Sequence, residues 1–281
     1  EPEGGKILFA GQDITHLNQK GLMPIRKKLQ IVFQDPYSSL DPRWSIRRVI
    51  SEPLKAHRYG SRREINNRVE ELLDQVGLPQ DAADRVPSQF SGGQRQRIAV
   101  ARSLALEPEA IIADEPVSAL DVSIQAQIIN LLRDLQDRLS IGLLVIAHDL
   151  ALVHQISDRI IVMYLGEAVE EGPSDELVGN PQHPYTVALL SATPIPEPGG
   201  DRKRIVLTGD PPSPIYRPKG CRFHPRCPIA TEKCTIEKPP YVEISKDRKV
   251  ACWRAGEMDA PRDLWALKDV PLPEGVESAK K

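Results

Sequence analysis

Two carboxylates that directly follow an apolar run are the residues of this sequence best suited to chemistry. Asp114 and Glu115 come after the four apolar residues 110–113. If that run is a buried strand, both carboxylates emerge at the edge of a sheet, where one can bind Mg²⁺ and the other can activate water. The dipeptide alone is more often a solvated strand end before a turn, so its meaning depends on the neighbouring motifs.

A second candidate site begins at Ser91, Gly92, Gly93 and Gln94, which open an amphipathic helix expected over about residues 92–106. Glycines at a helix start leave backbone N–H groups accessible, and this end of a helix carries partial positive charge. Both properties suit a phosphate. Asp121 closes a short Ser-Ala-Leu-Asp sequence at 118–121, after the two carboxylates.

Two further polar residues also end apolar runs. Gln34 follows the run 29–33, and His148 follows the run 143–147. Both runs are typical of buried parallel strands. A single histidine after a strand is usually structural, so His148 gains weight only from the other motifs.

Taken in order, these motifs resemble the ATP-binding-cassette (ABC) ATPases over residues 5–172. Residues 90–94 match the signature motif, with Phe90 in place of the more frequent leucine, 110–115 match the Walker B strand, and 118–121 match the D-loop. Gln34 matches the Q-loop, and His148 matches the switch histidine.

The resemblance implies ATP and Mg²⁺ as cofactors. It implies that Asp114 binds Mg²⁺, that Glu115 is the general base, and that His148 contacts the γ-phosphate and orients the attacking water. Gln34 is expected to approach Mg²⁺ and water. The remaining nucleotide-binding residues would be Ser91, Gly92, Gly93, Gln94 and Asp121, the first three acting on the nucleotide of a second ATPase subunit.

The Gly-rich phosphate loop of such ATPases is not found in this sequence. The loop ends in Gly-Lys-Ser or Gly-Lys-Thr, whereas the pair Gly5-Lys6 is followed by Ile7. Residues 4–14 look like the segment that follows that loop. We therefore expect that the sequence lacks an N-terminal segment of several tens of residues, and that without it the chain does not hydrolyse ATP.

Composition predicts two parts in the chain of 281 residues. Of the 26 prolines, nine precede residue 173 and seventeen lie from Pro173 onward, so the second part should be rich in loops. We expect an α/β ABC ATPase domain of the P-loop NTPase type at 1–172, with a mostly parallel sheet and a helical insert near 37–106. A proline-rich C-terminal extension with a cysteine cluster should occupy 173–281, with a linker at 193–200.

Charge and hydropathy bear on the partners. The formal net charge is -2, and basic residues are mixed with acidic ones, which argues against a nucleic-acid surface. No apolar stretch approaches the length of about eighteen residues that a membrane-spanning helix needs. Any membrane association is therefore expected to come through a partner.

A second resemblance concerns residues 34–58 and 173–254. The segments 34–43, 180–186 and 220–228 are similar to the oligopeptide/dipeptide (and nickel) importers of the ABC family. This implies transmembrane permease subunits, a second ABC ATPase subunit and, indirectly, an extracytoplasmic solute-binding protein. It also implies a peripheral position on the cytoplasmic face of the cell membrane.

The four cysteines of the chain all lie in the second part. Cys221, Cys227, Cys234 and Cys252 have the spacing C-x5-C-x6-C-x17-C, unlike the short pairs of many zinc sites. Four thiolates can hold a 4Fe–4S cluster, and the resemblance to the importers favours one. Zinc is the first alternative, and thiols without a metal are the second.

Two other functions are weighed against peptide import. A soluble ABC ATPase acting on DNA or ribosomes would keep the fold. Neither the C-terminal extension at 173–281, which is similar to peptide importers, nor any basic stripe supports this function. A non-enzymatic metal-binding or redox module rests on the cysteine cluster alone.

Overall fold

A computed structural model describes residues 2–35, 39–192 and 205–258. The linker predicted at 193–200 lies outside the described residues. The chain divides into two compact units, Glu1–His148 and Asp149–Lys281, and each is described by itself. The domain boundary predicted at residues 172–173 differs from this division into compact units, and it stays a prediction.

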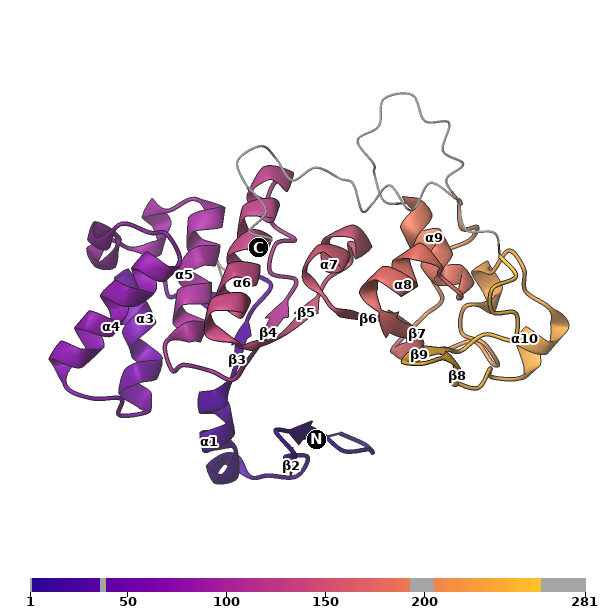
Figure 1. Cartoon of the computed structure of the whole chain (residues 1–281), viewed down its shortest axis with the longest axis horizontal. Helices are drawn as coiled ribbons and strands as arrows, with labels where there is room; N and C mark the ends of the chain where they lie inside the picture. Colours follow the sequence, from indigo (N-terminus) through magenta and orange to yellow (C-terminus); the bar gives the residue numbers. More distant parts are fainter. Residues whose placement is uncertain (1, 36–38, 193–204, 259–281) are drawn as a thin grey trace. The chain divides into compact units, whose positions relative to one another are not determined.

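The first unit contains the predicted mixture of strands and helices (Figure 1). Its elements in chain order are β1 (Leu8–Phe9), β2 (Gln12–Asp13), α1 (Gln19–Lys28), β3 (Leu29–Val32), α3 (Ile46–Ala56), α4 (Arg62–Gln75), the short 3-10 helices Gln80–Asp84 and Pro87–Gln89, α5 (Gly92–Leu104), β4 (Ala110–Asp114), α6 (Val122–Leu139) and β5 (Gly142–Ile146).

The strands β3, β4 and β5 form the expected parallel sheet, with β4 in the centre. Val32 pairs with Ala113, and Asp114 pairs with Ile146. The buried residues Ile111 and Ala113 of β4 alternate with partly exposed ones. All three strands therefore end at the same edge, which is where Gln34, Glu115 and His148 follow in the sequence.

The predicted helical insert is formed by α3, α4 and α5, which pack against one another (Figure 1). Their contact faces are fully buried at Ile50, Leu72 and Ile98. Ser61 begins α4 with a capping box, in which its hydroxyl accepts from the Glu64 N–H and its own N–H donates to the Glu64 carboxylate.

The spacing of Ile124, Ile128, Leu131, Leu132, Leu135 and Leu139 predicts a crossover helix with these residues on one face, and α6 buries a slightly different face. Leu131, Leu132 and Leu135 are buried as expected, whereas Leu139 is 41% exposed and Ile129 is buried. Leu139 is the last residue of the helix, just before Ser140, whose φ of 53° ends it. The apolar stripe therefore stops one turn earlier than the spacing indicated.

The second unit contains a sheet in the strand order β6-β7-β9-β8, in which all pairs are antiparallel. Its elements are α7 (Leu150–Ile156), β6 (Arg159–Tyr164), β7 (Glu167–Pro173), α8 (Ser174–Gly179), α9 (Pro184–Ala192), the 3-10 helix His224–Arg226, α10 (Glu232–Ile236), β8 (Val242–Ser245) and β9 (Arg248–Val250). The segments 159–165 and 168–171 on either side of Gly166 predict the hairpin β6–β7, whereas β8 and β9 were not predicted.

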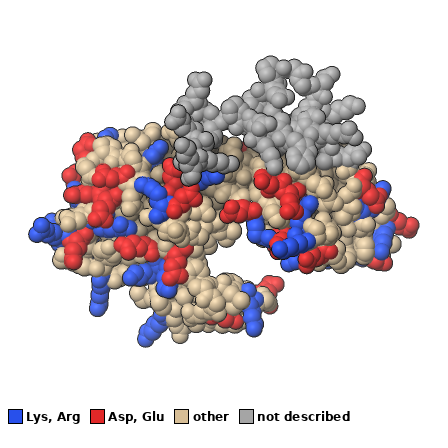
Figure 2. All heavy atoms as spheres, viewed as in Figure 1, with Lys and Arg blue, Asp and Glu red and all other residues tan. Residues whose placement is uncertain are grey.

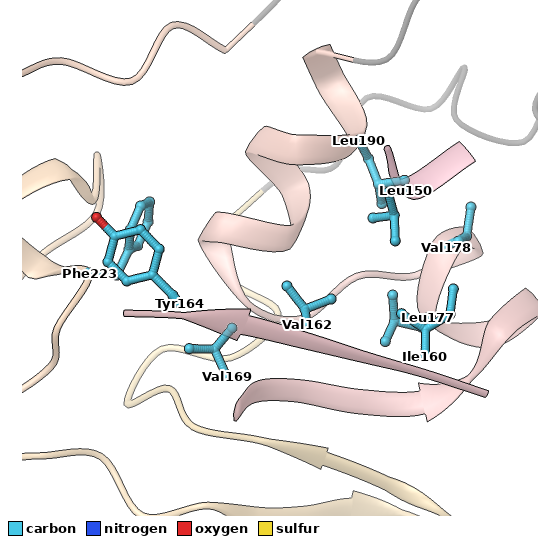
Figure 3. Close-up of a cluster of buried hydrophobic side chains, with 9 residues drawn as sticks. All are labelled: Leu150, Ile160, Val162, Tyr164, Val169, Leu177, Val178, Leu190 and Phe223. Carbon is cyan, nitrogen blue, oxygen red and sulfur yellow. The ribbon is translucent and has the colours of Figure 1, made fainter. Parts of the chain in front are cut away.

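Aromatic packing ties the cysteine-bearing tail to this sheet. Phe223 is 1% exposed and belongs to a core cluster with Tyr164 of β6 and Leu190 of α9 (Figure 3). The rings of Phe223 and Tyr164 meet edge to face, with centroids 5.2 Å apart. Full burial of a phenylalanine stabilises a fold by roughly 1.5–3 kcal/mol.

A buried ion pair adds a second tie between the tail and β7. The Arg248 guanidinium of β9 donates to the Glu170 carboxylate at 3.1 Å and to the carbonyl of Asn180 at 2.8 Å. The other donors to Glu170 are the backbone N–H groups of Gln182 and His183, just ahead of α9. The pair therefore joins β7, β9 and the loop before α9.

The surface carries both signs of charge. Figure 2 shows Lys and Arg side chains lying among Asp and Glu side chains on the face in view. Of the helices that the structure describes, none has the length and apolar character needed to cross a lipid bilayer.

Candidate functional site

The carboxyl edge of the parallel sheet brings three of the predicted site residues together. Gln34 lies two residues beyond β3, Glu115 directly follows β4, and His148 lies two residues beyond β5. The Gln34 amide donates to Glu115 Oε2 at 2.7 Å. His148 Nδ1 lies 3.6 Å from Glu115 Oε1. Each oxygen of the Glu115 carboxylate is thus approached by one side chain from a neighbouring strand end.

The backbone of Glu115 is held in an uncommon conformation. Its φ is 42°, in the left-handed region that residues other than glycine seldom adopt. The Glu115 N–H donates to the carbonyl of Ile146 on β5 at 2.8 Å. Its own carbonyl accepts from both the N–H and the hydroxyl of Ser118. These bonds fix the turn that aims the carboxylate, and such strain is often found at functional positions.

Asp114 is the last residue of β4, and it is partly buried. The predicted magnesium ligand therefore lies at the same sheet edge, one residue before Glu115. Glutamine and carboxylate oxygens are the kind of ligands that Mg²⁺ prefers, so the residues at this edge have suitable chemistry for that ion.

The signature residues form the predicted helix start. Ser91 caps α5: its hydroxyl accepts from the Gln94 N–H at 3.3 Å, while Gln94 Oε1 accepts from the Ser91 N–H at 3.0 Å. This capping box occupies the side chains of both residues. The N–H groups of Gly92 and Gly93 have no hydrogen-bond acceptor among the described residues, as expected for the first turn of a helix.

The two glycines also allow a close approach to the segment around Asp121. A Cβ atom on Gly93 would lie 2.5 Å from Ile124 Cγ2, and one on Gly92 would lie 3.1 Å from Leu120 Cδ2. Any side chain at position 93 would therefore collide with the first turn of α6. This packing role is separate from phosphate binding, and the sequence alone gave no sign of it.

Asp121 is the N-cap of α6. Its Oδ1 accepts from the Ser123 hydroxyl at 2.8 Å and from the Ile124 N–H at 3.1 Å. These bonds, the one from Ser123 foremost, lower the pKa of the Asp121 carboxyl. Asp121 lies with the signature residues, and no hydrogen bond among the described residues joins this group to Gln34, Glu115 or His148.

The four cysteines are unpaired, and they all line one small cavity of the second unit. Phe223, His224 and Trp253 are also part of its wall. His224 Nδ1 bonds the Cys221 carbonyl at 2.8 Å.

Burial raises the pKa of Cys221 and of Cys227, and it raises the pKa of Cys252 to about 11. The protonated thiols must lose their protons before they can bind a metal. Among the residues that the structure describes, no group of three or more His, Cys, Asp or Glu side chains is arranged to hold a metal ion. The thiols therefore share a cavity without forming a metal site as they stand.

Some features of the site have no signal in the sequence. The left-handed backbone of Glu115 and the contacts of Leu120 and Ile124 with the signature glycines depend on segments brought together by folding. The capping box at Ser91 and Gln94 did have a signal, namely serine followed three residues later by glutamine.

Two protein families match the chain. The family described as ABC transporter matches residues 1–118. The family described as oligopeptide/dipeptide transporter, C-terminal region, matches residues 169–234.

Similar proteins agree with these matches. A probable peptide ABC transporter ATP-binding protein of Sinorhizobium fredii is 48% identical over 278 residues, covering 99% of this chain and 79% of the relative. The oligopeptide transport ATP-binding protein AppF of Bacillus subtilis is 52% identical over 255 residues, covering 90% of this chain and 78% of the relative.

Solved structures share the fold. CbiO1 from Clostridium perfringens, part of an ABC transporter complex, matches with a TM-score of 0.58 and 32% identity over 63% of this chain and 69% of that one. A dimeric ATP-binding cassette bound to ADP and phosphate matches with a TM-score of 0.56 and 32% identity over 62% of this chain and 75% of that one. The chain belongs to the ABC transporter family, among the ATP-binding subunits of its oligopeptide/dipeptide transporters.

Proposed function

We propose that this chain is the ATP-binding subunit of a peptide importer. It couples ATP hydrolysis to the import of oligopeptides or dipeptides through transmembrane permease subunits. It acts with a second ATP-binding subunit, identical or related, at the cytoplasmic face of the cell membrane, and an extracytoplasmic solute-binding protein delivers the peptide. The similarity to peptide importers at both ends of the chain supports this function over that of a soluble ABC ATPase.

The division of labour follows the chain. Residues 1–172 would form the ATPase region, and residues 173–281 the extension typical of peptide importers. The observation that carries the proposal is the Glu115 carboxylate at the sheet edge, bonded by Gln34 and approached by His148.

In the proposed reaction, Glu115 accepts a proton from the water that attacks the γ-phosphate. His148 orients that water and contacts the γ-phosphate. Because Gln34 is bonded to Glu115, its position would depend on whether nucleotide is bound at the site. Asp114 would hold Mg²⁺, which neutralises charge on the phosphates when it is bound. A carboxylate that is already aimed needs little reorganisation during the reaction.

Ser91, Gly92, Gly93 and Gln94 would act on the nucleotide of the second subunit. The N–H groups of Gly92 and Gly93 and the positive end of α5 suit a γ-phosphate. Asp121 supports this surface by capping α6, whose first turn packs on Gly93. Closure of two subunits over ATP would thus depend on the start of α5.

Co-purification from native membranes tests the partners. The subunit as its gene encodes it, tagged and extracted in mild detergent, should bring down integral-membrane permease subunits and a second ATP-binding subunit. Recovery with ribosomes or DNA and without a membrane protein would contradict the importer proposal.

The cysteines carry a separate proposal. We propose that Cys221, Cys227, Cys234 and Cys252 hold a 4Fe–4S cluster, with Zn²⁺ as the alternative metal. All four thiols line one cavity, which supports a common ligand. Because the described side chains form no metal-holding group, the proposal requires the thiols to move and to deprotonate on binding.

Metal analysis separates the possibilities. Anaerobically purified protein should contain about four irons per chain and show the broad visible absorption of an iron–sulfur cluster. Cys234→Ser should lose both. One zinc per chain without iron would favour the alternative, and four titratable thiols in folded, metal-free, anaerobic protein would refute both metals.

A further inference from the structure

A cavity of about 470 Å³ lies in the second unit, and none of its lining residues belongs to the proposed ATP site. It is formed by the start of β7, the segment after Cys221, the prolines before β8, and the residue that follows β9. The volume is in the range of small-molecule sites, which are typically apolar with a few convergent polar groups. The lining residues used below are Glu167, Arg222, Phe223, Lys238, Pro239, Pro240 and Tyr241.

One wall of the cavity is charged. Glu167 Oε1 accepts from Arg222 Nη2 at 2.7 Å and from Lys238 Nζ at 2.6 Å. Two cations thus share one carboxylate oxygen, which leaves this wall with a net positive charge. The Arg222 side chain is 16% exposed and also bonds the carbonyl of Leu165, so it is held in place. The Lys238 side chain is 64% exposed, and its ion pair with Glu167 is the contact that a ligand would have to replace.

The rest of the lining includes apolar and aromatic side chains. Phe223 is fully buried, and Pro239 and Pro240 lie next to each other in the chain. The Tyr241 hydroxyl donates to Glu171 Oε2 at 2.9 Å, which fixes the ring while leaving it 40% exposed. A proline and tyrosine surface of this kind offers contact area to an apolar side chain at little cost in conformational entropy.

We propose that this cavity binds a short peptide with a free C-terminal carboxylate and an apolar C-terminal side chain. The carboxylate takes Lys238 from Glu167, and the side chain packs on Pro240 and Tyr241. Charge complementarity favours an anionic group, and the apolar wall favours a peptide over an inorganic anion. The proposal extends the proposed function, on which it rests, by giving the subunit itself a binding site for the transported class of compound.

Isothermal titration calorimetry on the chain of residues 1–281 tests the site without ATP or permease. The probes are the dipeptide Ala-Phe and its C-terminal amide. Ala-Phe should bind, and the amide should bind at least roughly tenfold more weakly because it lacks the charge that engages Lys238. Lys238→Ala should weaken binding of Ala-Phe by a similar factor. Lys246→Ala removes an exposed lysine of the same unit, and it should leave the affinity unchanged.

The outcomes distinguish this site from the proposed import function. Equal binding of both probes, or binding that Lys238→Ala does not weaken, would overturn the site. Absence of binding together with a dimer that Lys238→Ala dissociates would show that a second copy of the chain fills the cavity, and would also overturn it. Neither result touches peptide import, which co-purification of the permease tests independently.

Discussion

Gly93 has a steric role that phosphate binding does not explain. The position of Ile124 Cγ2, 2.5 Å from where a Cβ would be, leaves no space for a methyl group. The glycine therefore decides how closely the start of α5 can approach the start of α6. Ser91 caps α5 and Asp121 caps α6. A side chain at position 93 would therefore disturb the hydrogen bonds of both caps.

Gly93→Ala should lower the free energy of unfolding by about 1–3 kcal/mol, because overpacking forces the first turn of α6 to shift. Chemical denaturation of the chain measures the loss. Gly142→Ala is the matched control, since a Cβ there would meet Ala110 at an ordinary contact distance of 3.5 Å. Ile124→Ala removes the Cγ2 atom that collides with a methyl group at position 93. The costs of Gly93→Ala and Ile124→Ala should therefore be non-additive in the double variant. Equal costs for the two glycine variants would contradict the steric role.

Among the elements, those with a local apolar pattern were predictable. The runs before Glu115 and His148 became β4 and β5, and the helical spacing at 124–139 became α6. Strand β8 alternates apolar and polar residues over only four positions, and all four are exposed, so no buried face strengthens this short pattern. Strand β9 pairs with β7, far back in the chain, as well as with β8, and its Val250 is buried between them.

The candidate site likewise has features that follow from local sequence and features that depend on long-range contacts. Residue type and order predicted that Gln34, Glu115 and His148 each follow a strand, and the structure shows that these parallel strands end at one edge of the sheet. The left-handed φ of Glu115 depends on its bond to Ile146 across the sheet, which no sequence pattern near Glu115 specifies. The ion pair of Glu170 with Arg248 likewise joins residues that are remote in sequence.

We expect the buried ion pair of Glu170 and Arg248 to hold β9 on β7 and on the loop before α9. Burial raises the pKa of the Glu170 carboxyl, while the backbone N–H of His183 and the Arg248 charge act in the opposite direction. Arg248→Met should cost roughly 3–5 kcal/mol, because it leaves a buried carboxylate without its cation. Arg159→Met breaks the more exposed pair with Glu171 and should cost less than about 1 kcal/mol.

Hydrogen exchange can follow this pair directly. In the Arg248→Met variant, amides of α9 and of residues 242–250 should exchange faster than in the Arg159→Met variant. Similar exchange in the two variants would show that the buried pair does not hold the tail.

His183, directly before α9, makes the stability of the second unit sensitive to acid. His183 is 1% exposed, and its Nδ1 accepts from the Tyr185 N–H at 3.1 Å, which requires an unprotonated nitrogen. Burial lowers the pKa of His183 to about 4. The unfolded chain therefore binds a proton near pH 6.5 that the folded chain refuses, so stability falls as the pH decreases from there toward about 4.

The total loss over that interval should be roughly 3 kcal/mol, and most of it should occur between about pH 6 and about pH 4. Chemical denaturation at a series of pH values, followed by tryptophan fluorescence, measures it. His183→Asn keeps an acceptor for the Tyr185 N–H but does not titrate, so its stability should depend less on pH. Parallel pH profiles for the two proteins would contradict this assignment.

At the scale of the whole molecule, the chain separates two tasks. The first unit carries every residue proposed for ATP hydrolysis, from Gln34 to His148. The second unit carries the cysteines, the buried pair and the cavity at Lys238. Substitutions at these residues of the second unit should therefore leave the contacts of Gln34 and His148 with Glu115 in place.

Substitution of the proposed general base tests the central claim most directly. The subunit as its gene encodes it, assembled with its permease, should lose at least roughly a hundredfold in ATP turnover on Glu115→Gln. ATP binding should persist, because the amide keeps the shape of the side chain and leaves the phosphate contacts in place. Glu109→Gln is the control, since it removes only a half-exposed ion pair with Lys28. Loss of turnover in Glu115→Gln alone, with an ATP-dependent dimer that persists, is the predicted result; turnover close to that of the unmodified protein would contradict the account.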